Sequence, residues 1–329
     1  MKKLLTVLLS LVLLLGLTAC GNSAEDAESQ TVKIGLLSID DSLPFFVAEQ
    51  DGLFEEYGVD VELVPFGSAL DKETALEAGE IDGDMTDLVV TGLLQKGGLD
   101  VKIVSTALGA EPNEGRFVLL ASPGSGITDI SQLKGQTIAI GNNTIIQYVG
   151  DKMCEMNGFA ESDIITENIP DLALRMETLL SDGIPAAILP DPLATVALKN
   201  GAVSLVDDTE LTDENGNPVN LSQSVVIFRQ EAIDQKADAI KSAMQAYNEA
   251  KNKITNDPES YRQALLEFTS IPENLADSYA MPSYTAYSLP TQEEVEAVFE
   301  WMLKKGLLDE KYNYSDMVDE SFSTPADGN

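Results

Sequence analysis

Histidine is absent from this 329-residue chain, and cysteine occurs only twice. The chain therefore lacks the usual base of Ser-His-Asp and Cys-His catalytic sites and the commonest ligand of zinc sites. Basic residues are also scarce, since 20 lysines and arginines stand against 55 aspartates and glutamates, giving a formal net charge of −35. Such a charge excludes nucleic acid as a partner. The composition favours a globular protein, and we expect neither a cofactor nor a metal site in it.

The N-terminus has the features of an export signal. Lys2 and Lys3 precede an apolar run over 4–15 that is too short for a membrane span, and the run ends in Leu-Thr-Ala followed by Cys20. This order resembles the bacterial lipobox. The resemblance implies a signal peptide at 1–19, a diacylglyceryl group on Cys20, a flexible tether over 20–30, and a protein anchored on the extracytoplasmic face of the cell membrane. An ordinary secretory cleavage site is the alternative. Lipidation of Cys20 leaves Cys154 without a partner, so we expect a buried thiol there.

The stretch over 32–66 predicts a β-α-β unit. An apolar run at 32–37 indicates a buried strand, Pro44 suits the first turn of a helix, Gly58 suits a helix end, and alternation over 59–63 indicates a second strand. The same criteria predict further strands at 81–85, 101–107, 117–121, 137–140, 186–189 and 222–229, and helices at 68–78, 88–94, 170–180, 231–256 and 258–268, with another after the capping box at Thr291.

Three segments resemble one protein family. They are similar to segments of the nitrate/sulfonate/taurine and thiamine-precursor solute-binding proteins of ABC importers. The segments are Pro44-Phe-Phe-Val-Ala-Glu with the following Gly-Leu-Phe and Gly-Val-Asp-Val-Glu, the Gly-Glu-Ile-Asp step at Gly79, and Asp129-Ile-Ser-Gln-Leu-Lys-Gly. The resemblance implies an α/β fold of the type II periplasmic-binding-protein kind, with two lobes like a Venus flytrap. Breaks in the pattern at 109–115 and 221–224 predict the two crossings of its hinge. The expected parts are 31–112 and 224–329 for the first lobe and 113–223 for the second.

This resemblance implies capture of a small organic solute by lobe closure and its delivery to ABC permease subunits. The protein is then a monomeric binding protein and not an enzyme. Two alternatives stay open: an enzyme of the same fold that acts on a thiamine-pyrimidine-like ligand, and a ligand-sensing lipoprotein without a role in transport.

Candidate ligand residues follow the carboxyl ends of the predicted strands, where open α/β sheets bind their ligands. Each of them has the alternative role of capping a helix or forming a turn. Arg175 is treated separately: a sulfonate would favour a guanidinium partner, but Asp171 four residues earlier predicts a structural ion pair instead. The candidates are Asp41, Ser42, Thr86 and Asp87 in the first lobe and Asn142, Asn143, Thr144 and Asp191 in the second.

Overall fold

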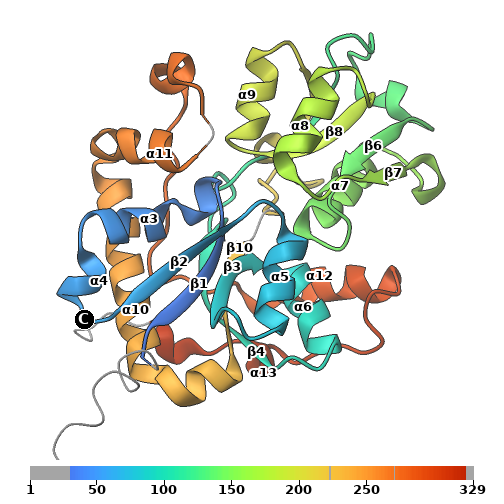
Figure 1. Ribbon diagram of the computed structural model, residues 1–329. Helices are drawn as coiled ribbons and strands as arrows, with labels where there is room; N and C mark the ends of the chain where they lie inside the picture. Colours follow the sequence, from blue (N-terminus) through green and yellow to red (C-terminus); the bar gives the residue numbers. More distant parts are fainter. Residues whose placement is uncertain (1–29, 222–223, 270, 324–329) are drawn as a thin grey trace, which may run out of the picture. The chain divides into compact units, whose positions relative to one another are not determined.

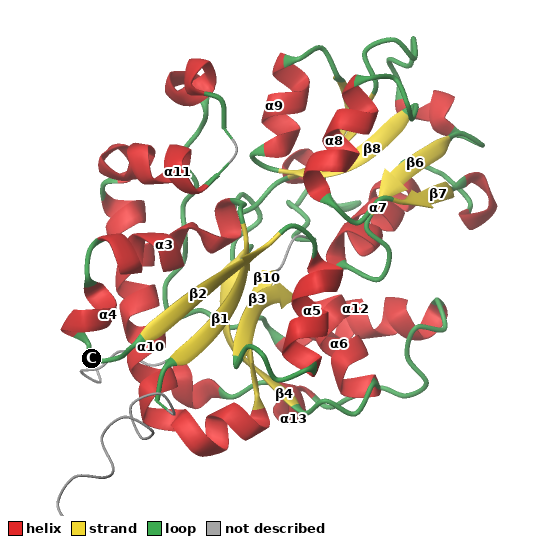
Figure 2. Ribbon diagram, in the orientation of Figure 1, coloured by secondary structure: helices red, strands yellow, loops and turns green. Residues whose placement is uncertain are grey.

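Two β-sheets organise the chain, each with five strands in the part that the structure describes (Figures 1 and 2). The computed structural model describes residues 30–221, 224–269 and 271–323. Residues from Val32 onward form one compact unit, separate from the segment that precedes it. Cys20 and the predicted signal peptide therefore lie outside the described residues.

The first sheet has the strand order β2-β1-β3-β10-β4. Strand β1 pairs in parallel with β2 and β3, whereas β10 runs antiparallel to β3 and β4. β10 comes late in the sequence, so the chain leaves this sheet after β4 and returns to its interior. The strands are β1 (Val32–Leu37), β2 (Val61–Phe66), β3 (Gly83–Asp87), β4 (Val101–Leu108) and β10 (Ser224–Arg229).

The second sheet repeats this arrangement with the order β7-β6-β8-β5-β9. Strand β6 pairs in parallel with β7 and β8, and β5 runs antiparallel to β8 and β9. The strands are β5 (Phe117–Ala121), β6 (Thr137–Ile140), β7 (Ile165–Asn168), β8 (Ala186–Pro190) and β9 (Val203–Asp207).

Helices cover both sheets. Figure 1 shows α3, α4 and α10 on one side of the first sheet and α5, α6 and α12 on the other. We call the first sheet with these helices the first lobe, and the second sheet with α7, α8 and α9 the second lobe. The α-helices are α3 (Leu43–Gln50), α4 (Leu53–Glu56), α5 (Ala69–Glu77), α6 (Leu88–Lys96), α7 (Ile145–Met156), α8 (Leu172–Leu180), α9 (Leu193–Lys199), α10 (Gln230–Asn256), α11 (Arg262–Phe268), α12 (Gln292–Lys304) and α13 (Tyr314–Met317).

The predicted α/β architecture with two lobes and two crossings is confirmed. One crossing runs from the end of β4 at Leu108 to the start of β5 at Phe117, and the other leads into β10 at Ser224. Residues 222–223 of the second crossing lie outside the described part. The exact lobe boundaries after 112 and 223 stay predictions.

Several element boundaries differ from the sequence prediction. Strand β3 begins at Gly83 instead of residue 81, so Thr86 and Asp87 are its last residues and do not follow it. Helix α8 begins at Leu172, and its N-cap is Asp171 instead of the predicted start at Pro170. β2 extends to Phe66 through Pro65, which is tolerated because β2 is an edge strand and needs no hydrogen bond on its outer side.

No helix among the described residues is long and apolar enough to cross a membrane.

Candidate functional site

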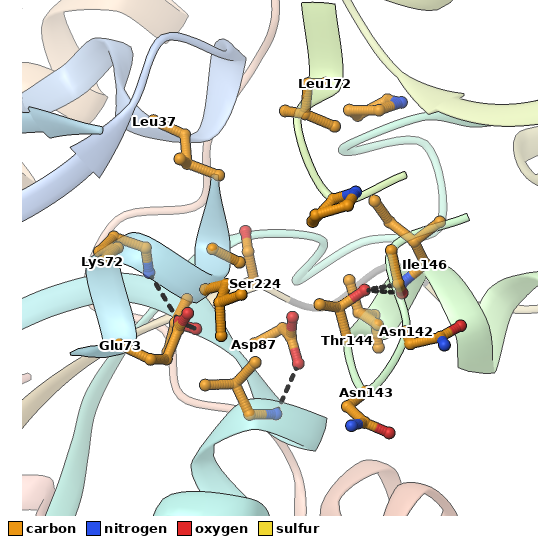
Figure 3. Close-up of a pocket in the computed structure, with 18 of the residues that line it drawn as sticks. Leu37, Lys72, Glu73, Asp87, Asn142, Asn143, Thr144, Ile146, Leu172 and Ser224 are labelled. Carbon is orange, nitrogen blue, oxygen red and sulfur yellow. Dashed lines mark hydrogen bonds and ion pairs between the residues drawn. The ribbon is translucent and has the colours of Figure 1, made fainter. Parts of the chain in front are cut away.

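A cavity of about 390 Å³ is lined by residues of both lobes. Most of its wall is apolar, and a smaller set of charged and amide side chains projects from the strand ends and helix starts. Figure 3 shows Lys72, Glu73 and Asp87 on one wall and Asn142, Asn143 and Thr144 on the other. An apolar cavity of this size with a few directed polar groups is typical of a small-molecule site.

Six of the eight predicted residues line this cavity, and the other two do not. Asp191 lines a smaller neighbouring cavity, to which Asp41 also belongs. Ser42 lines neither cavity: it is fully buried at the start of α3. The six are Asp41, Thr86, Asp87, Asn142, Asn143 and Thr144.

Asp87 is held by the helix that follows it. One carboxylate oxygen accepts hydrogen bonds from the backbone N–H groups of Val89 (2.8 Å) and Val90 (2.9 Å), so Asp87 caps α6. Burial raises the pKa of Asp87 to about 6, although hydrogen bonds from the amides of Val90 and Ile145 oppose that rise. Because Ile145 opens α7, this carboxylate contacts both lobes.

The first turn of α7 forms the opposite wall. The Thr144 hydroxyl accepts a hydrogen bond from the amide of Ile146 (3.3 Å) and donates one to the carbonyl of Gly141 (2.8 Å). Asn143 adopts a left-handed backbone conformation with φ of 60°, and both Asn142 and Asn143 expose their side chains. The backbone N–H groups of Asn142 and Asn143 donate to Asn168 and Gln147, so these two residues offer their exposed side-chain amides to a polar ligand atom.

A buried ion pair supports the first-lobe wall. Nζ of Lys72 lies 2.8 Å from Asp84 and 3.2 Å from Glu73, and it donates a hydrogen bond to the carbonyl of Met85. Burial alone would lower the pKa of Lys72, but the two carboxylates outweigh it and raise that pKa. The Thr86 hydroxyl donates to the same Glu73 (3.0 Å). Sequence reasoning missed Lys72 because its partner Asp84 lies on another element, β3.

The predicted ion pair between Arg175 and Asp171 is absent from the described contacts. The guanidinium of Arg175 instead donates to the backbone carbonyls of Ile169, Ile188 and Pro170, and the Asp171 carboxylate caps α8. Burial lowers the pKa of Arg175 to about 10. A Cβ atom on Gly141 would lie 2.9 Å from Nη2 of Arg175, so glycine there lets the strand end approach the guanidinium.

Asp191 is fixed within the second lobe. Its carboxylate lies 3.1 Å from Nη1 of Arg116 and accepts hydrogen bonds from the amide (3.0 Å) and the hydroxyl (2.8 Å) of Thr195. Arg116 also contacts Asp207 through Nε at 2.7 Å. Asp191 therefore has a structural role that the sequence did not indicate, and its contact with a solute stays a prediction.

Cys154 is a free, buried thiol on α7, as the sequence predicts. Burial raises its pKa to about 12, so the thiol stays protonated and unreactive at neutral pH.

Comparison with known proteins supports this description. The chain is 28% identical over 244 residues to the "Arginine-binding extracellular protein ArtP" of Bacillus subtilis (strain 168), covering 65% of this chain and 90% of that protein. It is 25% identical over 338 residues to the "Putative aliphatic sulfonates-binding protein" of the same organism, covering 98% and 96% of the two chains. The relatives thus carry the names of binding proteins.

Solved structures share the fold. The alkanesulfonate-binding protein SsuA from Xanthomonas axonopodis pv. citri, bound to MOPS, superposes with a TM-score of 0.74 at 17% identity, covering 88% of this chain and 98% of that one. A family model described as NMT1/THI5 like matches residues 40–261, which is more than half of the sequence. The chain belongs to the NMT1/THI5-like family.

Proposed function

We propose that this protein captures a small organic solute outside the cytoplasmic membrane and delivers it to the permease of an ABC importer. The observation that carries the proposal is the cavity itself, whose lining comes from both lobes. A solute held there contacts both lobes at once. It therefore binds the closed arrangement more tightly than the open one and shifts the population toward closure.

Capture without conversion fits the residues that are present. Covalent catalysis needs an activated nucleophile, and histidine, the commonest base beside such a nucleophile, is absent from the chain. Lys72, Glu73 and Asp87 of the first-lobe wall are engaged with neighbouring side chains or with helix N–H groups. We therefore infer a binding protein and not an enzyme acting on its ligand.

The lipid anchor on Cys20 and a monomeric state complete the proposal. Two acyl chains at Cys20 hold a protein stably at a membrane, because each buried methylene contributes about 0.8 kcal/mol. An anchored monomer stays close to its permease while the tether allows the lobes to reorient.

A thermal-shift screen of the purified protein tests the proposal, with sulfonates, amino acids, amines, thiamine precursors and flavins as candidate solutes. We expect one chemical class to raise the melting temperature in a saturable manner. Cells that lack the protein should also lose uptake of the labelled hit. Binding without any change in uptake would indicate a sensor instead of an importer component.

A further inference from the structure

A small side pocket of about 20 Å³ adjoins the main cavity. Asp41, Phe117, Ile145, Pro190 and Ser224 line both spaces, so the side pocket is an extension of the cavity toward the crossings between the lobes. Its volume fits about one non-hydrogen atom with its hydrogens, such as a water molecule or an ammonium group.

Asp40 supplies an unpartnered acceptor to this side pocket. Its side chain is 5% exposed, and one carboxylate oxygen accepts a hydrogen bond from the hydroxyl of Tyr279. The other oxygen, Oδ1, has no hydrogen-bond partner among the described residues. A buried carboxylate oxygen without a donor is costly, so the pocket is suited to a donor that comes from outside the protein.

The electrostatic surroundings favour a positively charged donor. Asp40, Asp41 and Asp191 all line the side pocket, and Asp191 and Asp41 add to the effect of burial in raising the pKa of Asp40. Arg116 is the basic residue of this lining, but it is shared between Asp191 and Asp207. A cation in the side pocket would relieve the repulsion among the carboxylates.

A metal ion does not suit this place. Among the described residues, no group of three or more histidines, cysteines, aspartates or glutamates lies close enough to hold one. A protonated amine needs no such coordination shell, because its nitrogen carries several N–H donors that can reach separate acceptors.

The basic residues of the main cavity are poorly placed to bind an oxyanion. Lys72 is bound to Asp84, Glu73 and the carbonyl of Met85. The guanidinium of Arg175 donates to backbone carbonyls on three of its nitrogen atoms. The wall thus offers acceptors more readily than positively charged donors.

We propose that the solute is an organic amine whose protonated nitrogen enters the side pocket lined by Asp40, Asp41 and Asp191. Its apolar part lies in the main cavity against side chains such as Leu37, Val90 and Leu172. The inference rests on the proposed function, since it names the chemical class of solute for the same cavity.

Calorimetric titration with matched probes tests the inference on the purified protein. Each set shares one carbon skeleton, for example 2-phenylethylamine, 2-phenylethanol and 2-phenylethanesulfonate, and further sets extend the skeleton to alkyl chains of several lengths. We expect the tightest binder to be an amine that binds at least tenfold more tightly than the alcohol and the sulfonate with the same carbon skeleton. This comparison needs no variant and so does not depend on how a substitution folds.

Asp41→Asn then locates the amine. Asp41 is partly exposed, and asparagine nearly matches its shape, so this substitution removes the charge with little change in packing. We expect at least tenfold weaker amine binding, whereas Glu80→Gln, which removes the same charge from an exposed residue outside both cavities, should bind as the wild type does.

The outcomes separate the two proposals. A sulfonate or carboxylate as the tightest binder, or an Asp41→Asn variant that folds and binds the amine normally, overturns the amine assignment and leaves the solute-binding function intact. If none of the probes or candidate solutes binds saturably, the result contradicts both the amine assignment and the solute-binding function.

Discussion

Asp87 both caps helix α6 and lines the cavity. Its carboxylate caps the helix through Val89 and Val90, and the same side chain lines the space between the lobes. Truncating a capping residue lowers the free energy of unfolding of the protein, and truncating a ligand-contacting residue weakens the binding of the ligand. The two effects can be measured separately on one variant.

Asp87→Ala should reduce both quantities. At pH 4, where the Asp87 carboxyl is neutral in the folded state, we expect a loss of about 0.5–2 kcal/mol in the free energy of unfolding from the lost cap. Solute binding should weaken by about 1–3 kcal/mol if the carboxylate contacts the solute. Asp129→Ala is the control, because Asp129 caps a short helix outside the cavity through Ser131. Urea unfolding measures the stability of each variant, and calorimetry measures its affinity for the solute. The control should lose stability but bind the solute as the wild type does. If Asp87→Ala also keeps the wild-type affinity, Asp87 has no ligand role.

The raised pKa of Asp87, about 6, predicts a dependence of stability on pH. The folded state favours the neutral carboxyl, so this contribution to stability is complete below pH 4 and is lost as pH rises through 6. Between pH 4 and 7 the wild type should lose about 2 kcal/mol relative to Asp87→Asn, which keeps an oxygen for the cap but does not ionise. Urea unfolding at each pH measures this difference. Parallel stability curves would show that the carboxyl titrates normally.

At the scale of elements, periodicity predicted the buried strands well and the more exposed strands poorly. Strands β1 and β5 match their predicted ranges, because both carry continuous apolar runs. β7 was not predicted, since all of its side chains are exposed and it carries no burial pattern. The prediction ended β3 at residue 85 because Thr86 and Asp87 are polar, yet both are buried through contacts with Glu73 of α5 and with the start of α6 that no local pattern reveals.

The same limit applies to the candidate site. The rule that ligands lie beyond strand ends identified half of the polar cavity lining. The sequence could not reveal that Arg175 turns to backbone carbonyls, or that Asp191 pairs with Arg116, because both contacts join distant parts of the chain. The sequence thus indicated which charged residues matter but not which groups they contact.

Helices α7 and α12 connect the two lobes through Asp151. Its carboxylate accepts a hydrogen bond from Nε1 of Trp301 (3.0 Å) and lies 2.9 Å from Nζ of Lys305, with its side chain 12% exposed. Asp151→Ala leaves the indole N–H of Trp301 without its acceptor and leaves Lys305 paired with the exposed Glu161, so we expect a loss of about 1–3 kcal/mol in unfolding free energy. Urea unfolding measures this loss.

Glu161→Gln provides the matched control for Asp151→Ala. Glu161 also contacts Lys305, at 2.6 Å, but its side chain is 69% exposed. Solvent screens an exposed pair, so we expect a clearly smaller loss of unfolding free energy from Glu161→Gln than from Asp151→Ala. Equal losses in the two variants would show that the contact between α7 and α12 has no special role.

At the scale of the whole molecule, the lipid anchor is tested on Cys20. Cys20→Ser removes the thiol that the lipobox-like sequence presents for acylation. We expect the variant to be released from membranes or to retain its signal peptide, as judged by fractionation and mass spectrometry. Fractionation and mass identical to those of the parent would contradict the lipoprotein assignment.

The central claim is that a solute closes two lobes around a shared cavity. The chain passes between the lobes twice, and the cavity draws its lining from both. Such an arrangement lets ligand binding pull the lobes together.

Small-angle X-ray scattering, with and without the tightest binder from the matched-probe titrations, tests this claim most directly. We predict that saturating solute reduces the radius of gyration, and that Asp41→Asn at the same solute concentration shows a smaller reduction because less of the protein is bound. An identical scattering curve for the free and the saturated wild-type protein would contradict closure.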